Sequence, residues 1–217
     1  MIKAVIFDLD GTLLDTIDDI TDSLNIALAG GGFKTHTAAE MKMFVGSGVD
    51  VLVRRALAGA PCTDEQVSGV KARYMEEYAA RRTVKTRVYD GVIQAIDELK
   101  ELGVKTAVLS NKPQRDTLKT VAHFFTLARF DLVLGQREGI PAKPDPAALC
   151  GIIKELGVDK EECLFVGDSD VDMKTAKNAG VKKIGVLWGF RDRQVLEENS
   201  ADYIIDKASR IVEIAKK

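Results

Sequence analysis

Short apolar runs alternate with amphipathic segments along most of the chain. The runs are uninterrupted and rich in β-branched residues, which is typical of buried strands, whereas the segments between them carry apolar residues at helical spacing. Alternation of this kind predicts an α/β fold with a doubly wound parallel sheet that is covered on both faces. The expected strands span residues 3–7, 105–109, 130–134, 163–166, 183–187 and 203–205, and the expected helices between them span 92–102, 114–124 and 146–157, with one ending at 179 and a last one near the C-terminus.

Residues 15–85 interrupt this alternation, because nearly all of them have helical spacing and none forms a clear strand pattern. The expected helices run from Asp15 or Thr16 to the glycines at 30–32, from Thr37 to Phe44, over 49–57, and from Thr63 or Asp64 to about Arg82. We therefore predict a core domain built from residues 1–14 and 86–217, with an all-helical domain of residues 15–85 inserted directly after the first strand.

Composition and charge narrow the class of partner. The chain has 217 residues and a net charge of −2, so it has no basic field that would attract nucleic acid or an anionic membrane. No apolar run approaches the length of a membrane span, and the first strand begins too close to Met1 to leave room for a secretory signal. Cys62, Cys150 and Cys163 lack metal-binding spacing and are expected to be reduced thiols. We expect a cytoplasmic monomer or homodimer.

Two carboxylates directly follow the first strand. Asp8 and Asp10 fall on the same side of an extended chain, so both side chains point into one small volume. Neighbouring carboxylates repel each other unless a cation lies between them, and Mg²⁺ prefers oxygen ligands. Gly11 follows, where backbone N–H groups can turn toward an anion. The segment predicts a site for a cation and an anion; taken alone, it also fits a solvated acidic turn.

Three further strand ends or adjoining loops carry small or charged polar residues, namely 110–112, Lys143, and Asp168 with Asp172. In a parallel sheet these groups open on the same edge as Asp8, and ligands of α/β sheets bind at that edge. Carboxylates bind Mg²⁺, whereas a hydroxyl, backbone N–H groups and a lysine bind a phosphoryl group. The combination indicates phosphoryl transfer, in which the charge on the phosphoryl oxygens has to be compensated.

The same residues form four motifs along the chain, which are Asp8-Leu9-Asp10-Gly11-Thr12-Leu13, Ser110, Lys143-Pro144, and Gly167-Asp168-Ser169-x-x-Asp172. This set resembles the four motifs of the haloacid dehalogenase (HAD) superfamily and frames nearly the whole core. The resemblance implies a Rossmann-like core with a helical cap inserted between the first two motifs. The helical residues 15–85 lie at that position.

The resemblance further implies a Mg²⁺-dependent phosphatase that works through an aspartyl phosphate. It gives Asp8 the role of nucleophile, and Asp10 the role of acid for the leaving group and then of base for water. Lys143 would pair with Asp8 and the phosphoryl group, and Ser110 and the backbone near Gly11 would bind phosphoryl oxygens. The implied Mg²⁺ ligands are Asp8, the backbone carbonyl of Asp10, Asp168 and, through water, Asp172.

Within the superfamily, the chain looks most like the phosphoglycolate phosphatases. The stretches that carry this likeness are 44–48, 51–57, 110–112 and 141–146. It implies a small phosphorylated metabolite as substrate, 2-phosphoglycolate, which is hydrolysed to glycolate and phosphate. The residues expected to contact it are Gly11, Thr12, Asn111 and Lys112 in the core and Gly46, Ser47, Gly48 and Arg54 in the cap.

Other reactions on the same scaffold stay open, because related phosphatases share parts of these stretches. Pyrophosphate, a sugar phosphate and a nucleotide are the alternative substrates. A dehalogenase is disfavoured by the second acid, Asp10, and a β-phosphoglucomutase-like mutase by Thr12, where those enzymes resemble Asp-Gly-Val. A phosphonatase needs a reactive cap lysine, and neither Lys34 nor Lys42 lies in a recognisable context. A binding module without turnover is disfavoured because the nucleophile Asp8 is intact.

Several charged residues near the motifs are expected to have no role in the site. Asp15, Asp18 and Asp19 favour the start of a helix, where acidic side chains complement the helix dipole. Arg191 and Arg193 are expected to be solvated, since exposure is the usual state of arginine.

Overall fold

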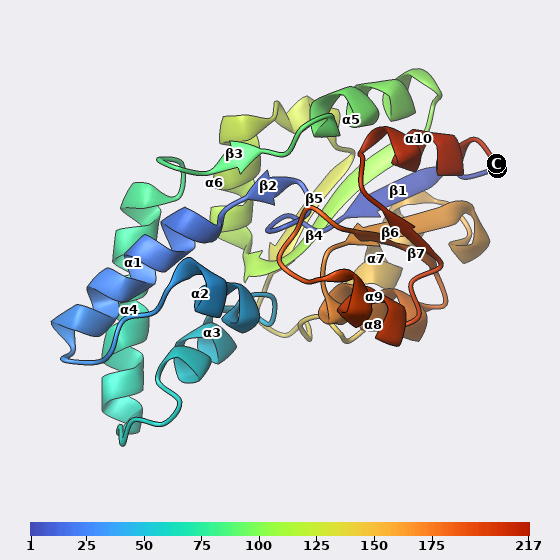
Figure 1. Ribbon diagram of the computed structural model, residues 1–217. Coiled ribbons are helices and arrows are strands. Elements are labelled where there is room, and N and C mark those ends of the chain that lie inside the picture. Colours follow the sequence, from blue (N-terminus) through green and yellow to red (C-terminus); the bar gives the residue numbers. More distant parts are fainter.

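A six-stranded parallel sheet forms the centre of the computed structural model, which describes residues 1–217 (Figure 1). The strand order is β5-β4-β1-β6-β7-β8, and every neighbouring pair is parallel. The strands are β1 (Ala4–Phe7), β4 (Lys105–Pro113), β5 (Leu132–Gln136), β6 (Cys163–Gly167), β7 (Lys182–Val186) and β8 (Tyr203–Ile205). The first strand lies inside the sheet between β4 and β6, so the three strands that carry the motifs end side by side.

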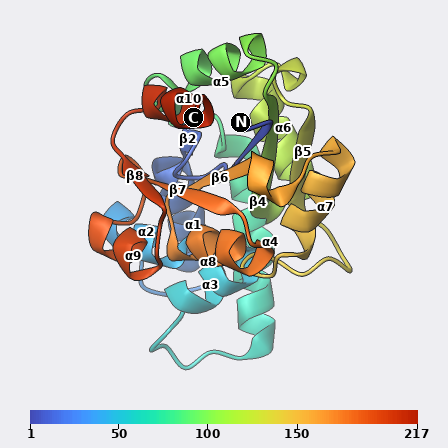
Figure 2. The same ribbon diagram turned by 90° about the vertical axis from the view of Figure 1, so that its right-hand side faces the viewer.

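Helices cover both faces of the sheet, which confirms the expected doubly wound α/β fold. One face packs on α5 (Val92–Glu101), α6 (Gln114–Phe124) and α10 (Ser209–Ala215), and the other on α7 (Ala147–Leu156) and α8 (Asp170–Ala179) (Figures 1 and 2). The residues of β1 alternate between the two faces, since Val5 and Phe7 belong to the first apolar cluster and Ala4 and Ile6 to the second. Every residue of β1 is therefore apolar.

Four helices form a separate layer beyond the carboxyl edge of the sheet, and we call them the helical layer (Figure 1). They are α1 (Ile17–Gly30), α2 (Ala38–Phe44), α3 (Val49–Ala56) and α4 (Asp64–Arg81). The layer has its own cluster of 16 buried apolar residues, to which the core contributes only Phe190. The caps expected at Thr37 and Thr63 are both present as reciprocal capping boxes. No helix is both long and apolar enough to cross a membrane.

The two connections between the sheet and the helical layer pair with each other. Strands β2 (Leu14–Asp15) and β3 (Arg87–Val88) form a small antiparallel ribbon. The sequence pattern indicates only loops at these positions. Next to it, the buried carboxylate of Asp19 accepts hydrogen bonds from the N–H of Lys85 and from both the N–H and the hydroxyl of Thr86, at 2.7–3.1 Å. The ribbon and the hydrogen bonds of Asp19 therefore hold the two connecting segments close to the start of α1.

Two strands and one short helix differ from the expectation. The fourth strand continues to Pro113, because residues beyond Leu109 pair with β5 after a shift in register. A short 3-10 helix (Leu127–Arg129) delays β5, which begins at Leu132 instead of residue 130. Helix α9 (Arg193–Glu198) was not expected, because so short a segment offers little periodicity; it buries Leu196 against Gly185.

We expect Asp19→Ala to lower the free energy of unfolding by about 3 kcal/mol, because it leaves the buried N–H and hydroxyl of Thr86 without their acceptor. Asp18→Ala is the matched control in the same helical turn, where the side chain is only half-buried; its effect should stay below about 0.5 kcal/mol. Urea unfolding of both variants measures the difference, and equal losses would show that Asp19 acts only through the helix dipole.

Candidate active site

Three buried carboxylates meet at the carboxyl edge of the sheet. Asp8 follows β1, Asp168 follows β6, and Asp172 lies in the first turn of α8. One carboxylate oxygen from each residue lies within 4.8 Å of the others. The parallel pairing of β1 with β6 brings Asp8 and Asp168 together, and the hydroxyl of Ser169 donates to Asp172 at 2.6 Å. The predicted convergence of the motifs is present in the structure.

Lys143 is the cation within this cluster. Its ammonium lies 2.8 Å from Oδ1 of Asp8 and 2.7 Å from Oδ1 of Asp172, and it donates to the carbonyl of Leu109 at 3.2 Å. The side chain is only 2% exposed, so water contributes little to its stabilisation. The three acceptors fix the ammonium directly beside the side chain of Asp8.

The cluster is electrostatically incomplete without a further cation. Burial raises the pKa of Asp8 well above its usual range, the charge of Asp172 raises it further, and Lys143 offsets only part of this. Burial and then the charge of Asp172 raise the pKa of Asp168 to about 7. Burial lowers the pKa of Lys143, but the neighbouring carboxylates of Asp172 and Asp8 outweigh this effect and raise its pKa above the usual value. Three carboxylates and one ammonium therefore leave net negative charge, and these oxygen donors fit a hard divalent cation.

The backbone around Asp168 is shaped to hold its carboxylate. A Cβ atom on Gly11 would lie 2.7 Å from Oδ1 of Asp168, and a Cβ on Gly189 would lie 2.7 Å from its Cγ, so both positions require glycine. The hydroxyl of Thr12 donates to Asp168 at 3.1 Å and the N–H of Phe190 at 2.8 Å. Thr12 is thus engaged in orienting this carboxylate, which is a different role from the expected contact with substrate.

The backbone N–H groups near Gly11, expected to face an anion, do not include the N–H of Gly11 itself. That N–H donates to the carbonyl of Leu14 at 2.8 Å and closes the turn before the ribbon. The N–H groups of Leu9 and Asp10, in contrast, have no acceptor within the protein. These two donors, one and two residues after Asp8, are the ones free to bind a phosphoryl oxygen.

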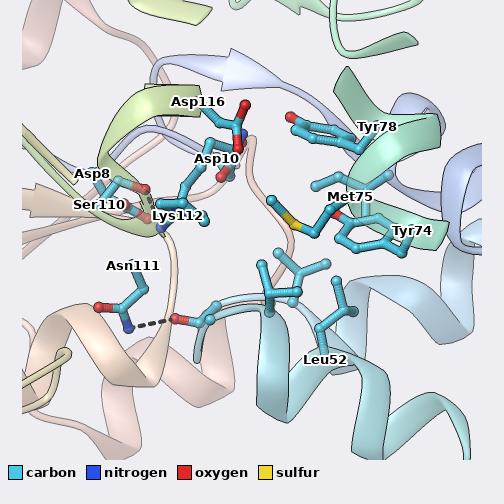
Figure 3. Close-up of a pocket in the computed structure, with 16 residues that line it drawn as sticks. Asp8, Asp10, Leu52, Tyr74, Met75, Tyr78, Ser110, Asn111, Lys112 and Asp116 are labelled. Atoms are coloured by element: carbon cyan, nitrogen blue, oxygen red, sulfur yellow. Dashed lines mark hydrogen bonds and ion pairs between the residues drawn. The ribbon is translucent and has the colours of Figure 1, made fainter. Parts of the chain in front are cut away.

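A cavity lies between the sheet edge and the helical layer, with about 550 Å³ of empty space that is partly open to solvent (Figure 3). The core lines it with charged and polar residues, and the helical layer lines it mainly with apolar ones. The core residues are Asp8, Asp10, Ser110, Asn111, Lys112, Pro113 and Asp116; those of the layer are Ile20, Val45, Gly46, Gly48, Val49, Leu52, Tyr74, Met75 and Tyr78. Asp8 is the one member of the carboxylate cluster that reaches this cavity.

Asp10 lies apart from the carboxylate cluster and is paired with Lys112 inside the cavity (Figure 3). Both side chains are mostly buried, and the ammonium of Lys112 also lies 5.0 Å from the ring centre of Tyr78. The N–H of Lys112 donates to the hydroxyl of Ser110 at 3.2 Å, which leaves the hydroxyl proton of Ser110 available for a ligand. Asp10 therefore faces the cavity beside the Asp8 carboxylate.

Comparison with known proteins decides the family. A family model described as haloacid dehalogenase-like hydrolase matches residues 5–186. The chain belongs to the haloacid dehalogenase-like hydrolases. This confirms the resemblance that the four motifs carry.

Individual relatives of this hydrolase are phosphatases. Phosphoglycolate phosphatase 1 of Pseudomonas aeruginosa is 36% identical over 208 residues, which are 94% of this chain and 76% of the relative. Phosphoglycolate phosphatase of Mesorhizobium japonicum is 33% identical over 215 residues, which are 98% of this chain and 95% of the relative. The crystal structure of a candidate phosphoglycolate phosphatase from Lactobacillus delbrueckii subsp. bulgaricus matches with a TM-score of 0.93 at 36% identity, over 98% of each chain. The chain is accordingly a phosphoric monoester hydrolase.

Asn111 has a different role in this hydrolase from the substrate contact expected of it. Its side-chain carbonyl accepts from the N–H of Lys143 at 2.8 Å, and its amide group donates to the carbonyls of Lys143 and Gly46 at 3.0 Å each. Every donor of the amide is therefore engaged within the protein. Asn111 fixes the backbone of Lys143 and joins the core to the loop of the helical layer at Gly46.

The helical-layer residues predicted to contact substrate separate into two groups. Gly46 and Gly48 line the cavity, and Ser47 lines a neighbouring one with Gly48 and Asn111. Arg54 does not line the cavity, since its side chain is 63% exposed and faces Asp64 at 3.6 Å. It lies on the solvent side of α3, so the expected contact of Arg54 with substrate is not supported.

Sequence reasoning missed Arg191, which was expected to be solvated and is in fact buried. Its guanidinium donates to the carbonyl of Val45 at 2.9 Å and to that of Lys42, at the C-terminal end of α2. Its neighbour Phe190 packs into the apolar cluster of the helical layer. The loop after β7 therefore connects Asp168 to the layer, and only the run of Trp-Gly-Phe-Arg at 188–191 after a strand marks it in the sequence.

We expect Arg191→Met to lower the free energy of unfolding by about 2 kcal/mol, because two carbonyls at the end of α2 lose a charged donor. Arg193→Met is the control, since that side chain is exposed and pairs only with Glu197; it should change stability by less than about 0.5 kcal/mol. Hydrogen exchange of α2 in both variants localises the effect. Unchanged exchange of α2 in Arg191→Met would contradict this role.

Proposed function

We propose that the chain hydrolyses 2-phosphoglycolate to glycolate and phosphate, through an aspartyl phosphate on Asp8 and with Mg²⁺ as cofactor. The observation that carries the proposal is the position of Asp8, which belongs to the buried carboxylate cluster and is the member that opens into the cavity. The names of the relatives support the choice of substrate. Pyrophosphate, sugar phosphates and nucleotides are the other substrates to be tested.

In the first step, a carboxylate oxygen of Asp8 attacks phosphorus and forms a new P–O bond, while the bond from phosphorus to the glycolate oxygen breaks. The ammonium of Lys143, held 2.8 Å from Asp8, compensates charge on the transferring group. The free N–H groups of Leu9 and Asp10 and the hydroxyl of Ser110 are the donors that orient the phosphoryl oxygens.

Asp10 acts as the general acid in the first step and as the general base in the second. It gives a proton to the leaving oxygen of glycolate, and it then takes one from the water that attacks the aspartyl phosphate. The second attack breaks the bond between phosphorus and Asp8 and releases phosphate. Asp10 lines the same cavity as Asp8, so one carboxyl group serves both half-reactions.

Asp8, Asp168 and Asp172 are the side chains that would hold Mg²⁺, together with the backbone carbonyl of Asp10. The ion, when bound, supplies positive charge to the carboxylate cluster and to the phosphoryl oxygens. Asp172 already accepts from Lys143 and Ser169, so its part in holding the ion is shared with fixing these two residues. The raised pKa values of Asp8 and Asp168 agree with a site that lacks one cation.

The helical layer acts in this proposal as a cap made of residues 15–85, which excludes bulk water from the phosphoryl group and leaves room for the attacking water molecule. The layer is joined to the core by the ribbon of β2 and β3, and it contacts the core through Arg191 and Asn111. Its cavity wall is mostly apolar, which lowers the local polarity around the reacting group.

We expect Asp8→Asn to lower kcat at least about 10⁴-fold, since the amide lacks the attacking charge. The variant should remain folded, because it removes one of three buried like charges and Lys143 keeps Asp172 as a partner. Asp170→Asn, at an exposed ion pair of α8, is the matched control and should retain most turnover. Steady-state rates with 2-phosphoglycolate measure both; substantial turnover by folded Asp8→Asn would exclude Asp8 as nucleophile.

Removal of divalent cations with EDTA should abolish turnover, and addition of Mg²⁺ in excess should restore it, because the buried carboxylates and an anionic substrate repel each other without a cation. The rate is measured before chelation, after chelation, and after dialysis and re-addition of the ion. Full activity in the presence of the chelator would rule out a metal-dependent reaction.

A further inference from the structure

We propose that Lys112 of the core and Tyr78 of helix α4 form a subsite that binds the carboxylate of the substrate. The inference rests on the proposed function in one respect, namely that the substrate is a phosphorylated carboxylic acid. It names the two side chains that distinguish such a substrate from a neutral phosphate ester of the same length. Neither side chain takes part in the transfer of the phosphoryl group itself.

The charges along the cavity wall restrict where a second anionic group can bind. Its lining includes the carboxylates of Asp8, Asp10 and Asp116, and Lys112 is the single cationic residue in that lining. Lys143 lies behind the wall with its ammonium held by two carboxylates of the cluster. A carboxylate that enters beside the phosphoryl group is repelled by most of the core wall, and Lys112 is the position at which it is attracted.

Tyr78 contributes a donor that has no partner within the protein. The residue is only 2% exposed, it lines the cavity, and its buried hydroxyl makes no hydrogen bond. Buried hydroxyl groups are normally paired, so an unpaired one on a cavity wall points to an acceptor supplied by a ligand. Burial and nearby carboxylates, those of Asp10 and Asp116, raise the pKa of Tyr78, so its hydroxyl stays protonated and can donate.

The two groups lie on opposite walls and close to each other. The ammonium of Lys112 is 5.0 Å from the ring centre of Tyr78, and Figure 3 shows Lys112 extending toward Asp10 with Tyr78 on the facing helix. A carboxylate has two oxygens, so it can accept from the ammonium with one and from the hydroxyl with the other. Bound in this way, it would join the core to the helical layer directly above Asp8.

The carboxylate of Asp10 is the present partner of Lys112. A substrate carboxylate would share this contact with Asp10 or replace it at the ammonium of Lys112. Two arginines of the helical layer do not line the cavity: Arg82 faces Asp116 at 3.8 Å and donates to the carbonyl of Ala79, and Arg54 is exposed. The arrangement therefore leaves Lys112 and Tyr78 as the pair for a carboxylate.

The test compares two substrates of equal length, 2-phosphoglycolate and 2-hydroxyethyl phosphate, which differ only in carboxylate against hydroxymethyl. The measured quantity is the preference, that is the ratio of kcat/KM for the first to kcat/KM for the second. Lys112→Met should lower the preference about 100-fold, and Tyr78→Phe, which keeps the ring, about 10-fold. Any loss through the altered setting of Asp10 affects both substrates and cancels in the ratio.

Lys71→Met is the matched control, because this lysine lies at the neighbouring cavity and pairs with Asp50 on the helical layer. It removes the same charge without contact to the subsite, so its preference should equal that of the parent. An unchanged preference in Tyr78→Phe and Lys112→Met, or an equal fall in Lys71→Met, would overturn the subsite. A parent enzyme that does not prefer the carboxylate substrate would instead overturn the proposed function. Circular dichroism confirms folding, and Tyr78→Phe alone decides the matter if Lys112→Met does not fold.

Discussion

The burial of three carboxylates around one lysine is the constraint on which the rest of this structure depends. Asp8, Asp168 and Asp172 are brought within 4.8 Å of one another, and only Lys143 compensates their charge. Such a cluster is costly in a folded protein unless hydrogen bonds and a cation stabilise it. The glycines at 11 and 189 admit the carboxylate of Asp168, and the order of strands places β1 beside β6. The fold therefore maintains a site that attracts a divalent cation and a phosphoryl group.

The different composition of the two cavity walls is related to the negative charge of this cluster. The core wall of the cavity supplies carboxylates, a hydroxyl and lysine, whereas the wall of the layer is mostly apolar apart from its tyrosines. A charged core site that reacts with an ester needs to exclude bulk water, and an apolar wall does so without adding competing polar groups. Arg191 and Asn111 hold the layer against the core through backbone carbonyls, so the sequence of the layer can vary at those positions without loss of the contact.

The fold and the centre of the site could be predicted because they depend on local patterns. Uninterrupted apolar strands indicate a parallel sheet, and polar residues at their carboxyl ends then converge, as Asp8, Lys143 and Asp168 do. The errors concern partners that only the tertiary structure supplies. Thr12 donates to Asp168, and Arg191, which was expected to be solvated, donates to a backbone carbonyl of the helical layer. Tyr78 was missed because a tyrosine on an amphipathic helix has no sequence signal that separates packing from binding.

Binding of a divalent cation by the carboxylate cluster is the property on which the proposed reaction most directly depends. The decisive measurement is the thermal unfolding midpoint with increasing Mg²⁺, for the parent and for Asp168→Asn. We predict that the midpoint of the parent rises by about 5 °C or more at saturating Mg²⁺. The variant should begin with equal or higher stability in chelator, because one buried like charge is gone, and should respond weakly to the ion. A parent midpoint that is independent of Mg²⁺, or an equal rise in the variant, would contradict the account.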